Sequence, residues 1–247
     1  MAAVSPPTSN GLASGNHLLE AISHGICEVV ERDSTALWNT LDDEAARSTR
    51  IDLSTVDDPS CIEVLEKYER AGVAVGVWDI TSDVGLPSFA CTITDASPDP
   101  LRPLSSNSGH GCHPARQIAL LRALTEAAQS RLTFISGSRD DAFRNRYEHS
   151  RNLDVLRRCR AELDVQGPMR NFKHITTQEN ETLDQDVAWE LERLGSTAVR
   201  QVVVVNLTKP EFGLPVVRVV IPGLEGSDHS PHYSPGPRAE ALMESRR

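Results

Sequence analysis

The chain has 247 residues, of which 39% are hydrophobic and 24% are charged, and its formal net charge is −10 at pH 7. This composition indicates a globular protein with one large domain or two small ones, and no apolar run approaches the roughly 18 to 20 residues of a membrane-spanning helix. The excess of acid argues against binding to nucleic acid, which needs clustered Lys and Arg, and favours bound cations.

The cysteines and the first residues predict a cytoplasmic protein. The five cysteines are scattered and include no CxxC pair, so neither a disulfide framework nor a zinc knuckle is predicted. The opening string MAAVSPPTSNG has neither the basic region nor the apolar region of a secretion signal. We therefore expect a reducing, cytoplasmic environment and no membrane partner.

In the N-terminal half, helical periodicity comes before strand periodicity. Residues 1–9 contain two prolines and no apolar pattern, and are expected to be disordered. The elements predicted next, in chain order, are helices at about 14–32, 35–47 and 58–71, followed by strands at 73–80 and 87–94.

The C-terminal half begins with residues 105–114, which are rich in Gly, Ser and His and are expected to form a loop. Pro114 then starts a helix that runs to Arg131. The elements after it are helices near 151–163 and 182–194, then strands at 201–207 and 215–221. A Pro- and Ser-rich tail at 225–247 is expected to be flexible. The pattern is typical of an α/β or α+β domain, spanning 10–224, with a largely antiparallel sheet.

The first predicted helix carries different chemistries on its two sides. On a wheel of about 100° per residue, Asn16, Glu31 and Glu28 fall at about −40°, 20° and 80° from Glu20, and apolar residues occupy the opposite side. A solvated surface face is the ordinary explanation, but such faces usually mix charges. Here no Lys or Arg lies at i±3 or i±4 before Arg32. A hard cation such as Mg²⁺, held together with nucleotide phosphates, relieves this repulsion.

The helix that starts at Pro114 carries Arg122 and Glu126, four residues apart and therefore on one face. An exposed intrahelical ion pair, worth about 0.3 to 0.5 kcal/mol, would be an ordinary explanation. The preceding His110, Cys112 and His113 offer zinc-type ligands, but the chain has no second cluster to complete a zinc site. A Cys–His nucleophile pair, or His113 as a proton carrier, stays open.

Two spaced motifs in these helices resemble those of the YcaO family. The second is Arg122-x3-Glu126; the first comprises Asn16, Glu20 four residues later, and Glu28-x2-Glu31-Arg32. One departure is Ala13, where the family often has Ser. The resemblance implies an α+β fold with ATP and Mg²⁺ as cofactors. It implies nucleotide-binding roles for Asn16, Arg32 and Arg122, and metal-binding roles for Glu20, Glu28, Glu31 and Glu126.

Three longer strings look like the subgroup that works with a TfuA partner: GVWDITSDVGLPSFACTITD, LTEAAQSRLTFISGSRDD and GLPVVRVVIPGLEG. The resemblance implies a peptide substrate whose backbone amides become thioamides, with a TfuA-like or other sulfur-donating partner and a homodimer as candidate assemblies. The Pro-x-Pro-x-Pro ending of azoline-forming members is absent.

The family also places a Ser-x3-Glu-x2-Glu-Arg-type helix upstream, and no counterpart precedes Ser9. We therefore expect the N-terminal part of the domain to be missing. Two hypotheses remain. The chain takes part in ATP- and Mg²⁺-dependent activation of peptide amides, giving thioamides or azolines, or it is a truncated, non-catalytic interaction module.

Overall fold

A computed structural model describes residues 8–97, 99, 101, 104–137, 152–165, 167–226 and 233–245. The described helices are α1 (Leu18–Trp38), α2 (Asp43–Arg47), α3 (Pro59–Arg70), α4 (Arg116–Ser136), α6 (Leu153–Asp164), α7 (Leu183–Gly195) and α8 (Pro237–Glu244), with 3-10 turns η1 (Leu53–Thr55) and η2 (Phe172–His174). The described strands are β1 (Leu12–Ser14), β2 (Ile51–Asp52), β3 (Val73–Asp79), β4 (Ser88–Asp95), β5 (Asn107–Cys112), β6 (Arg170–Asn171), β7 (Val203–Asn206) and β8 (Val216–Val220).

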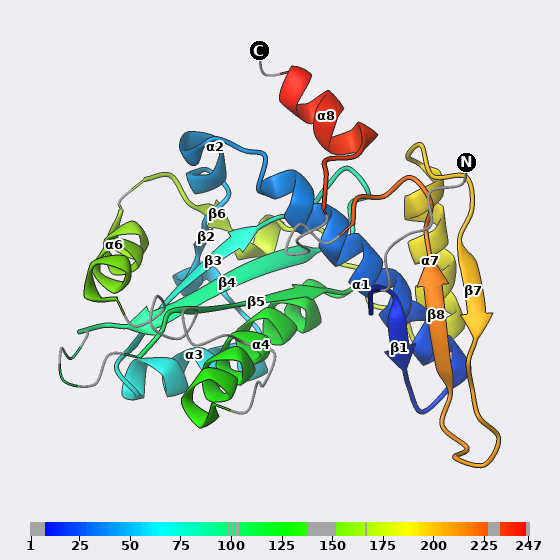
Figure 1. The fold of residues 1–247 in the computed structure, drawn as a ribbon, viewed down its shortest axis with the longest axis horizontal. Helices are drawn as coiled ribbons and strands as arrows, with labels where there is room; N and C mark the ends of the chain where they lie inside the picture. The colour runs from blue at the N-terminus through cyan, green and yellow to red at the C-terminus, as the bar shows by residue number, and fades with distance from the viewer. Residues whose placement is uncertain are drawn as a thin grey trace.

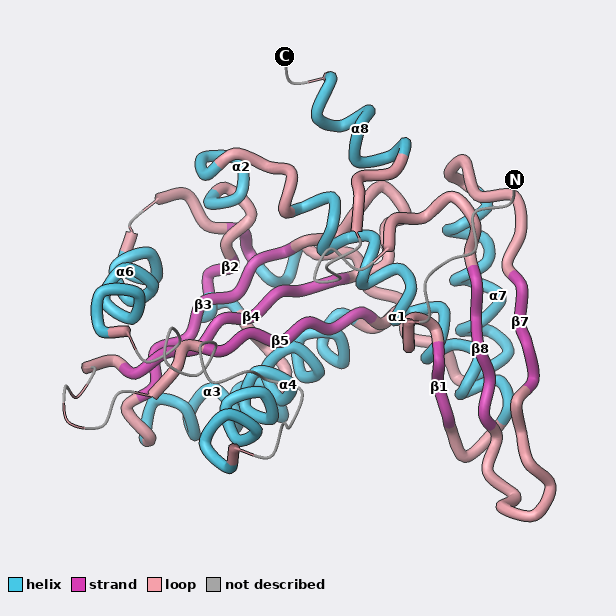
Figure 2. The backbone as a smooth tube through the Cα atoms, in the orientation of Figure 1, coloured by secondary structure: helices cyan, strands magenta, loops and turns pink. Residues whose placement is uncertain are grey.

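The strands form two three-stranded antiparallel sheets, β3-β4-β5 and β1-β8-β7, and a short parallel pair, β2-β6. Figure 1 shows the two larger sheets on opposite sides of the molecule with α1 running between them. Figure 2 shows the same arrangement along the backbone, with strands in magenta and helices in cyan. The predicted α+β class with a largely antiparallel sheet is confirmed. None of the described helices is long and apolar enough to cross a membrane.

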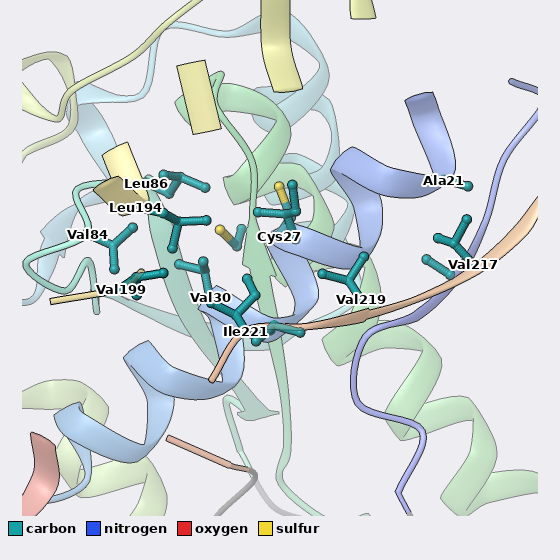
Figure 3. Packing of buried hydrophobic residues seen from close by; sticks show 14 residues of the cluster. Ala21, Cys27, Val30, Val84, Leu86, Leu194, Val199, Val217, Val219 and Ile221 are labelled. Atoms are coloured by element: carbon teal, nitrogen blue, oxygen red, sulfur yellow. The ribbon is translucent and has the colours of Figure 1, made fainter. Parts of the chain in front are cut away.

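Two hydrophobic clusters hold these layers together. One joins the buried side of α1 to α7 and β8, and Figure 3 shows its packing, with Val30 and Cys27 from α1 and Val219 from β8. The other lies between β3-β4-β5 and the helices α3 and α4, around Phe89 and Leu124. Burial of apolar side chains in the first cluster fixes the orientation of α1, and burial in the second holds α3 and α4 against the β3-β4-β5 sheet.

Helix α1 differs from the predicted boundaries. A helix was expected at 14–32 and another at 35–47, but α1 continues without a break to Trp38, and the later segment contributes only α2. The polar residues 33–35, at the boundary between the two expected helices, are buried within α1, and the Thr35 hydroxyl donates to the carbonyl oxygen of Glu31 at 2.8 Å. Side-chain bonds to the preceding turn allow hydroxyl residues in a helix interior.

The expectation of a loop at 105–114 is wrong for most of that segment, because Asn107–Cys112 form β5. Glycines replace apolar residues at the positions that face α4. A Cβ on Gly109 would lie 2.3 Å from the amide nitrogen of Ala127, and one on Gly111 would lie 2.1 Å from the carbonyl oxygen of Ala119. The glycines therefore allow α4 to pack directly on the strand backbone.

Two elements near the ends of the chain were not predicted. Residues 12–14 form β1, which pairs with β8 through Ala13 and Val217. The expected disorder of residues 1–9 falls mainly outside the described residues. Within the tail expected to be flexible, α8 is helical, and the Glu225 carboxylate accepts hydrogen bonds from three backbone N–H groups at its start. An acidic group at a helix N-terminus satisfies donors that have no partner in the helix.

Candidate functional site

A cavity of about 380 Å³ lies between the acidic face of α1 and the polar face of α4. Helix α4 is held against β5 by the glycine contacts described above, and α1 is held by its apolar side, so both polar faces point into the same space. The lining residues are His24, Glu28, Glu31, Arg32, His110, Arg122, Thr125, Glu126 and Gln129. The cavity thus contains three carboxylates and two guanidinium groups.

Helix α1 contributes Glu28, Glu31 and Arg32, all partly buried. Burial, with a smaller contribution from the nearby carboxylates of Glu126 and Glu28, raises the pKa of Glu31 to about 7 against the opposing effect of Arg32. Burial also raises the pKa of Glu28. The nearest approach of Arg32 to Glu28 is 4.0 Å, too long for a strong hydrogen bond. Negative charge in this cavity is therefore only partly compensated by the chain itself.

Helix α4 contributes Arg122 and Glu126, each of which is oriented by β5. Nη1 of Arg122 donates to the carbonyl oxygen of Cys112 at 3.2 Å, and Oε2 of Glu126 accepts from the backbone N–H of His110 at 3.0 Å. The two residues do not form an ion pair with each other at 4.0 Å or less. The ordinary intrahelical pair suggested by their spacing is therefore not formed, and both side chains remain directed towards the cavity.

Asn16 and Glu20 do not line this cavity. Oε2 of Glu20 accepts a hydrogen bond from the backbone N–H of Asn16 at 2.7 Å, and this contact is the main reason that the pKa of Glu20 is lowered. Both residues lie at the start of α1, beyond His24, which lines the cavity. Of the seven site residues predicted from the sequence, the structure brings together Glu28, Glu31, Arg32, Arg122 and Glu126.

His24 and Gln129 belong to the cavity but were not among the predicted site residues. The spacing of both residues in the sequence could have predicted them. His24 lies four residues from Glu20 and from Glu28, and Gln129 lies three residues after Glu126, so each shares a helical face with a predicted residue. Burial lowers the pKa of His24, and the nearby charge of Arg122 lowers it further.

The structure separates the environments of Cys112 and His113. Cys112 is fully buried in the core, which removes it as an accessible nucleophile. Nδ1 of His113 accepts from the backbone N–H of Ala115 at 3.0 Å, and burial together with Arg122 lowers the pKa of His113 to about 4. His113 is therefore neutral at pH 7, and its role as a proton carrier stays a prediction.

The donor chemistry of the cavity fits a nucleotide with Mg²⁺ better than a metal ion alone. Within the described residues, no group of three His, Cys, Asp or Glu side chains is arranged to hold a metal ion. Magnesium commonly uses one or two carboxylates and completes its shell with water and phosphate oxygens. Glu28, Glu31 and Glu126 supply carboxylates of that kind, and Arg32 and Arg122 supply the planar donors that pair with phosphate.

The fold and cavity together define an α+β protein whose polar site suits a phosphate-bearing ligand and a hard cation. The family model described as YcaO cyclodehydratase, ATP- and Mg²⁺-binding, matches residues 2–225. The chain belongs to the YcaO family, as its two motifs had predicted.

Similar proteins agree with this assignment. A Rhizobium leguminosarum bv. trifolii protein, named for its position in the tfuA 3′ region, is 36% identical over 94% of this chain and 56% of its own length. A heterocyclase solved in complex with substrate and cofactor has a TM-score of 0.72 and 27% identity over 90% of this chain and 29% of that one. The YcaO protein of Methanopyrus kandleri, bound with AMPPCP and Mg²⁺, shares the fold, with a TM-score of 0.68 and 23% identity over 91% of this chain and 58% of that one. The chain spans about half the length of the curated relatives it matches.

Proposed function

We propose that this chain takes part in ATP- and Mg²⁺-dependent activation of backbone amides in a peptide substrate. An amide carbon is a poor electrophile because of resonance with the nitrogen. Transfer of a phosphoryl group to the amide oxygen makes that oxygen a leaving group, so that a nucleophile can replace it. Glu28, Glu31 and Glu126 would hold Mg²⁺, while Arg32 and Arg122 would bind and neutralise phosphate oxygens.

The observation that carries this proposal is the convergence of three carboxylates and two arginines from α1 and α4 in one cavity. These five residues are also five of the seven positions that match the YcaO motifs. The description of the family as ATP- and Mg²⁺-binding supports the choice of ligand. Support for peptide modification comes from the similarity to a heterocyclase that was solved with its substrate and cofactor.

We infer that the product is a thioamide, with an azoline as the second candidate. A sulfide equivalent attacking the activated carbon gives a thioamide, whereas the side chain of a neighbouring Cys, Ser or Thr gives an azoline. The thioamide assignment is supported by the relative named for the tfuA 3′ region, which also makes a TfuA-like protein the candidate sulfur-donating partner. Assembly as a homodimer and a cytoplasmic location stay predictions.

Asn16 and Glu20 enter the proposal differently from the five cavity residues. Asn16 is exposed and Glu20 is partly exposed, and Glu20 lies one helical turn before His24, which lines the cavity. Asn16 would contact the nucleotide and Glu20 a second Mg²⁺ if the hydrogen bond between them opens when the ligand binds. This part of the proposal rests on the motif rather than on the arrangement of the free chain.

Calorimetry of the purified chain with ATP in the presence of Mg²⁺ tests the proposal. We expect binding by the unchanged chain and loss of most of that binding in Glu28→Gln and Glu31→Gln. Glu63→Gln is the matched control, because Glu63 is exposed on α3, pairs with Lys67 and does not line the cavity. Circular dichroism of each variant excludes unfolding as the cause. Equal binding by all four proteins would overturn the metal assignment, and absence of binding by the unchanged chain would favour a non-catalytic interaction module.

A further inference from the structure

The cavity between α1 and α4 adjoins two further hollows. The adjoining hollow has a volume of about 920 Å³ and shares Arg32, His110, Glu126 and Gln129 with the cavity. A third hollow of about 430 Å³ follows and shares Trp38, Trp78 and Glu162 with the second. Each pair of neighbouring hollows has lining residues in common, so the three follow one another along the surface, and together they are called the groove.

The floor of the groove is the face of β3-β4-β5 opposite α4. Ala90 lies at its centre, paired in register with Trp78 on one side and His110 on the other. One step along the strands, the hydroxyls of Thr92 and Ser108 lie 3.2 Å apart. Small and hydroxylated side chains leave room for a polypeptide backbone and offer hydrogen bonds to its amide groups.

The side of the groove formed by α4 also carries side chains that can hydrogen-bond to amide groups. Gln129 and Ser130 line the groove, and both carry side chains that can donate and accept hydrogen bonds. Arginines line the two ends of the groove rather than its centre, with Arg32 at one end and Arg47 and Arg50 at the other. The centre of the groove therefore suits uncharged amide groups better than phosphates.

A tryptophan pair lies near the other end of the groove. The rings of Trp38 and Trp78 are 6.1 Å apart with an interplanar angle of 53°, and both side chains are partly exposed. Nε1 of Trp38 already donates to the hydroxyl of Thr49 at 3.0 Å, so the ring offers the groove an apolar surface. Such a pair of rings favours binding of a ligand through an apolar or aromatic side chain.

We propose that this groove binds the peptide substrate in an extended conformation. The amide to be modified lies at the Glu126 and His110 end, and an apolar side chain of the peptide packs against Trp38 and Trp78. The assignment rests on the proposed function for the reacting end of the groove. It adds the path of the peptide and a preference for an apolar residue at a distance from the modified amide.

The test uses two blocked peptides of glycine and serine that differ at one central residue, leucine in one and aspartate in the other. Each is titrated into the full chain, and binding is followed by calorimetry. We expect the leucine peptide to bind at least about tenfold more tightly, because leucine buries apolar surface against the rings and aspartate does not. Equal affinities, or no binding of the leucine peptide at millimolar concentration, would overturn the proposal.

Ser108→Trp tests the position of the groove without altering its ends. Ser108 is exposed on β5, so a large side chain there is accommodated but fills the groove. Val203→Trp, at an exposed position on β7, is the matched control. We expect Ser108→Trp to abolish leucine-peptide binding while the affinity for ATP with Mg²⁺ changes by less than about twofold. Leucine-peptide binding equal to that of the control would overturn the proposal.

Trp78→Ala tests whether the tryptophan pair contacts the peptide side chain or the base of ATP. We expect this variant to lose the preference for leucine over aspartate and to keep its affinity for ATP. A loss of ATP affinity with the peptide preference intact would instead assign the pair to the base and overturn the proposal. Failure of the unchanged chain to bind ATP, with leucine-peptide binding retained, would count against the proposed function alone.

Discussion

Arg238 and Asp33 are 205 residues apart in the sequence and form a two-point ion pair, with Nε to Oδ1 at 2.9 Å and Nη2 to Oδ2 at 3.0 Å. Asp33 is fully buried and also accepts from the backbone N–H of Glu225 at 2.9 Å. This contact fastens the C-terminal segment to α1 at the residue directly after Arg32. The tail therefore stabilises the helix that carries the carboxylates of the cavity.

Arg238→Ala should leave the Asp33 carboxylate buried without its partner. Removing one member of a buried ion pair typically costs about 3 to 5 kcal/mol, so we expect a loss of that size in the free energy of unfolding, measured in urea. Arg47→Ala is the control, because Arg47 is exposed and lies 4.0 Å from Asp43, and its loss should cost less than about 0.5 kcal/mol. Similar costs for both variants would show that Asp33 is neutral or solvated in the folded protein.

Gly109→Ala should separate α4 from β5. The added Cβ would meet the backbone of α4 at 2.3 to 2.5 Å, and backbone atoms cannot move aside as a flexible side chain can. Overpacking of this kind costs about 1 to 3 kcal/mol, and it should also weaken ATP binding because Glu126 is oriented by the neighbouring His110. Thermal unfolding and calorimetry measure the two effects.

Gly195→Ala is the matched control for that substitution. Gly195 ends α7, and no atom lies within 4 Å of an added Cβ. We expect unchanged ATP binding and a stability equal to or up to about 1 kcal/mol above that of the original chain. If Gly109→Ala behaves like this control, close packing of α4 on β5 does not determine the site.

The acidic face of α1 could be predicted from the sequence because helical spacing alone places Glu28 and Glu31 on one side and apolar residues on the other. The same reasoning gave Arg122 and Glu126. Spacing could not predict that the Glu20 carboxylate accepts a hydrogen bond from the backbone N–H of Asn16, because that hydrogen bond depends on the conformation of the turn before the helix. Spacing determines which residues share a face, but hydrogen bonding determines which side chains reach the cavity.

Two parts of the fold had weak sequence signals for physical reasons. Strand β5 has glycine where a half-buried strand usually has an apolar side chain, so the alternation used to detect strands is absent at Gly109 and Gly111. Helix α8 lies in a Pro- and Ser-rich segment, and its anchoring contact is made to Asp33, far away in the sequence. Composition cannot reveal a partner at that separation.

Glu190 should make stability depend on pH in a recognisable range. The carboxyl is fully buried on α7; Oε1 accepts from the hydroxyl of Ser23 at 2.6 Å, and burial raises the pKa of Glu190 from 4.5 to about 7. Because the folded state binds this proton more tightly, the stabilising contribution is complete below about pH 4.5 and is lost as the pH rises through about 7.

Glu190→Gln removes that proton equilibrium while keeping the shape of the side chain. In urea unfolding at a series of pH values, we expect the variant to lose less stability than the original chain between about pH 4.5 and 7, by up to about 1.4 kcal/mol per pH unit. Glu31 titrates in the same range but is present in both proteins, so the difference isolates Glu190. Parallel pH profiles would mean that Glu190 is ionised when buried.

Glu20→Gln and Glu31→Gln should affect ATP binding unequally if the cavity defines the metal site of this chain. Glu31 is partly buried beside Glu28 and Glu126, so losing its charge should weaken binding of ATP with Mg²⁺ by at least about tenfold. Glu20 is partly exposed and lies outside the cavity, so we expect a change of less than about threefold in calorimetry. Equal losses would instead mean that the bond from Asn16 to Glu20 opens on binding and that both residues turn towards the ligand. That result would extend the site to the first turn of α1, as the motif alone predicts.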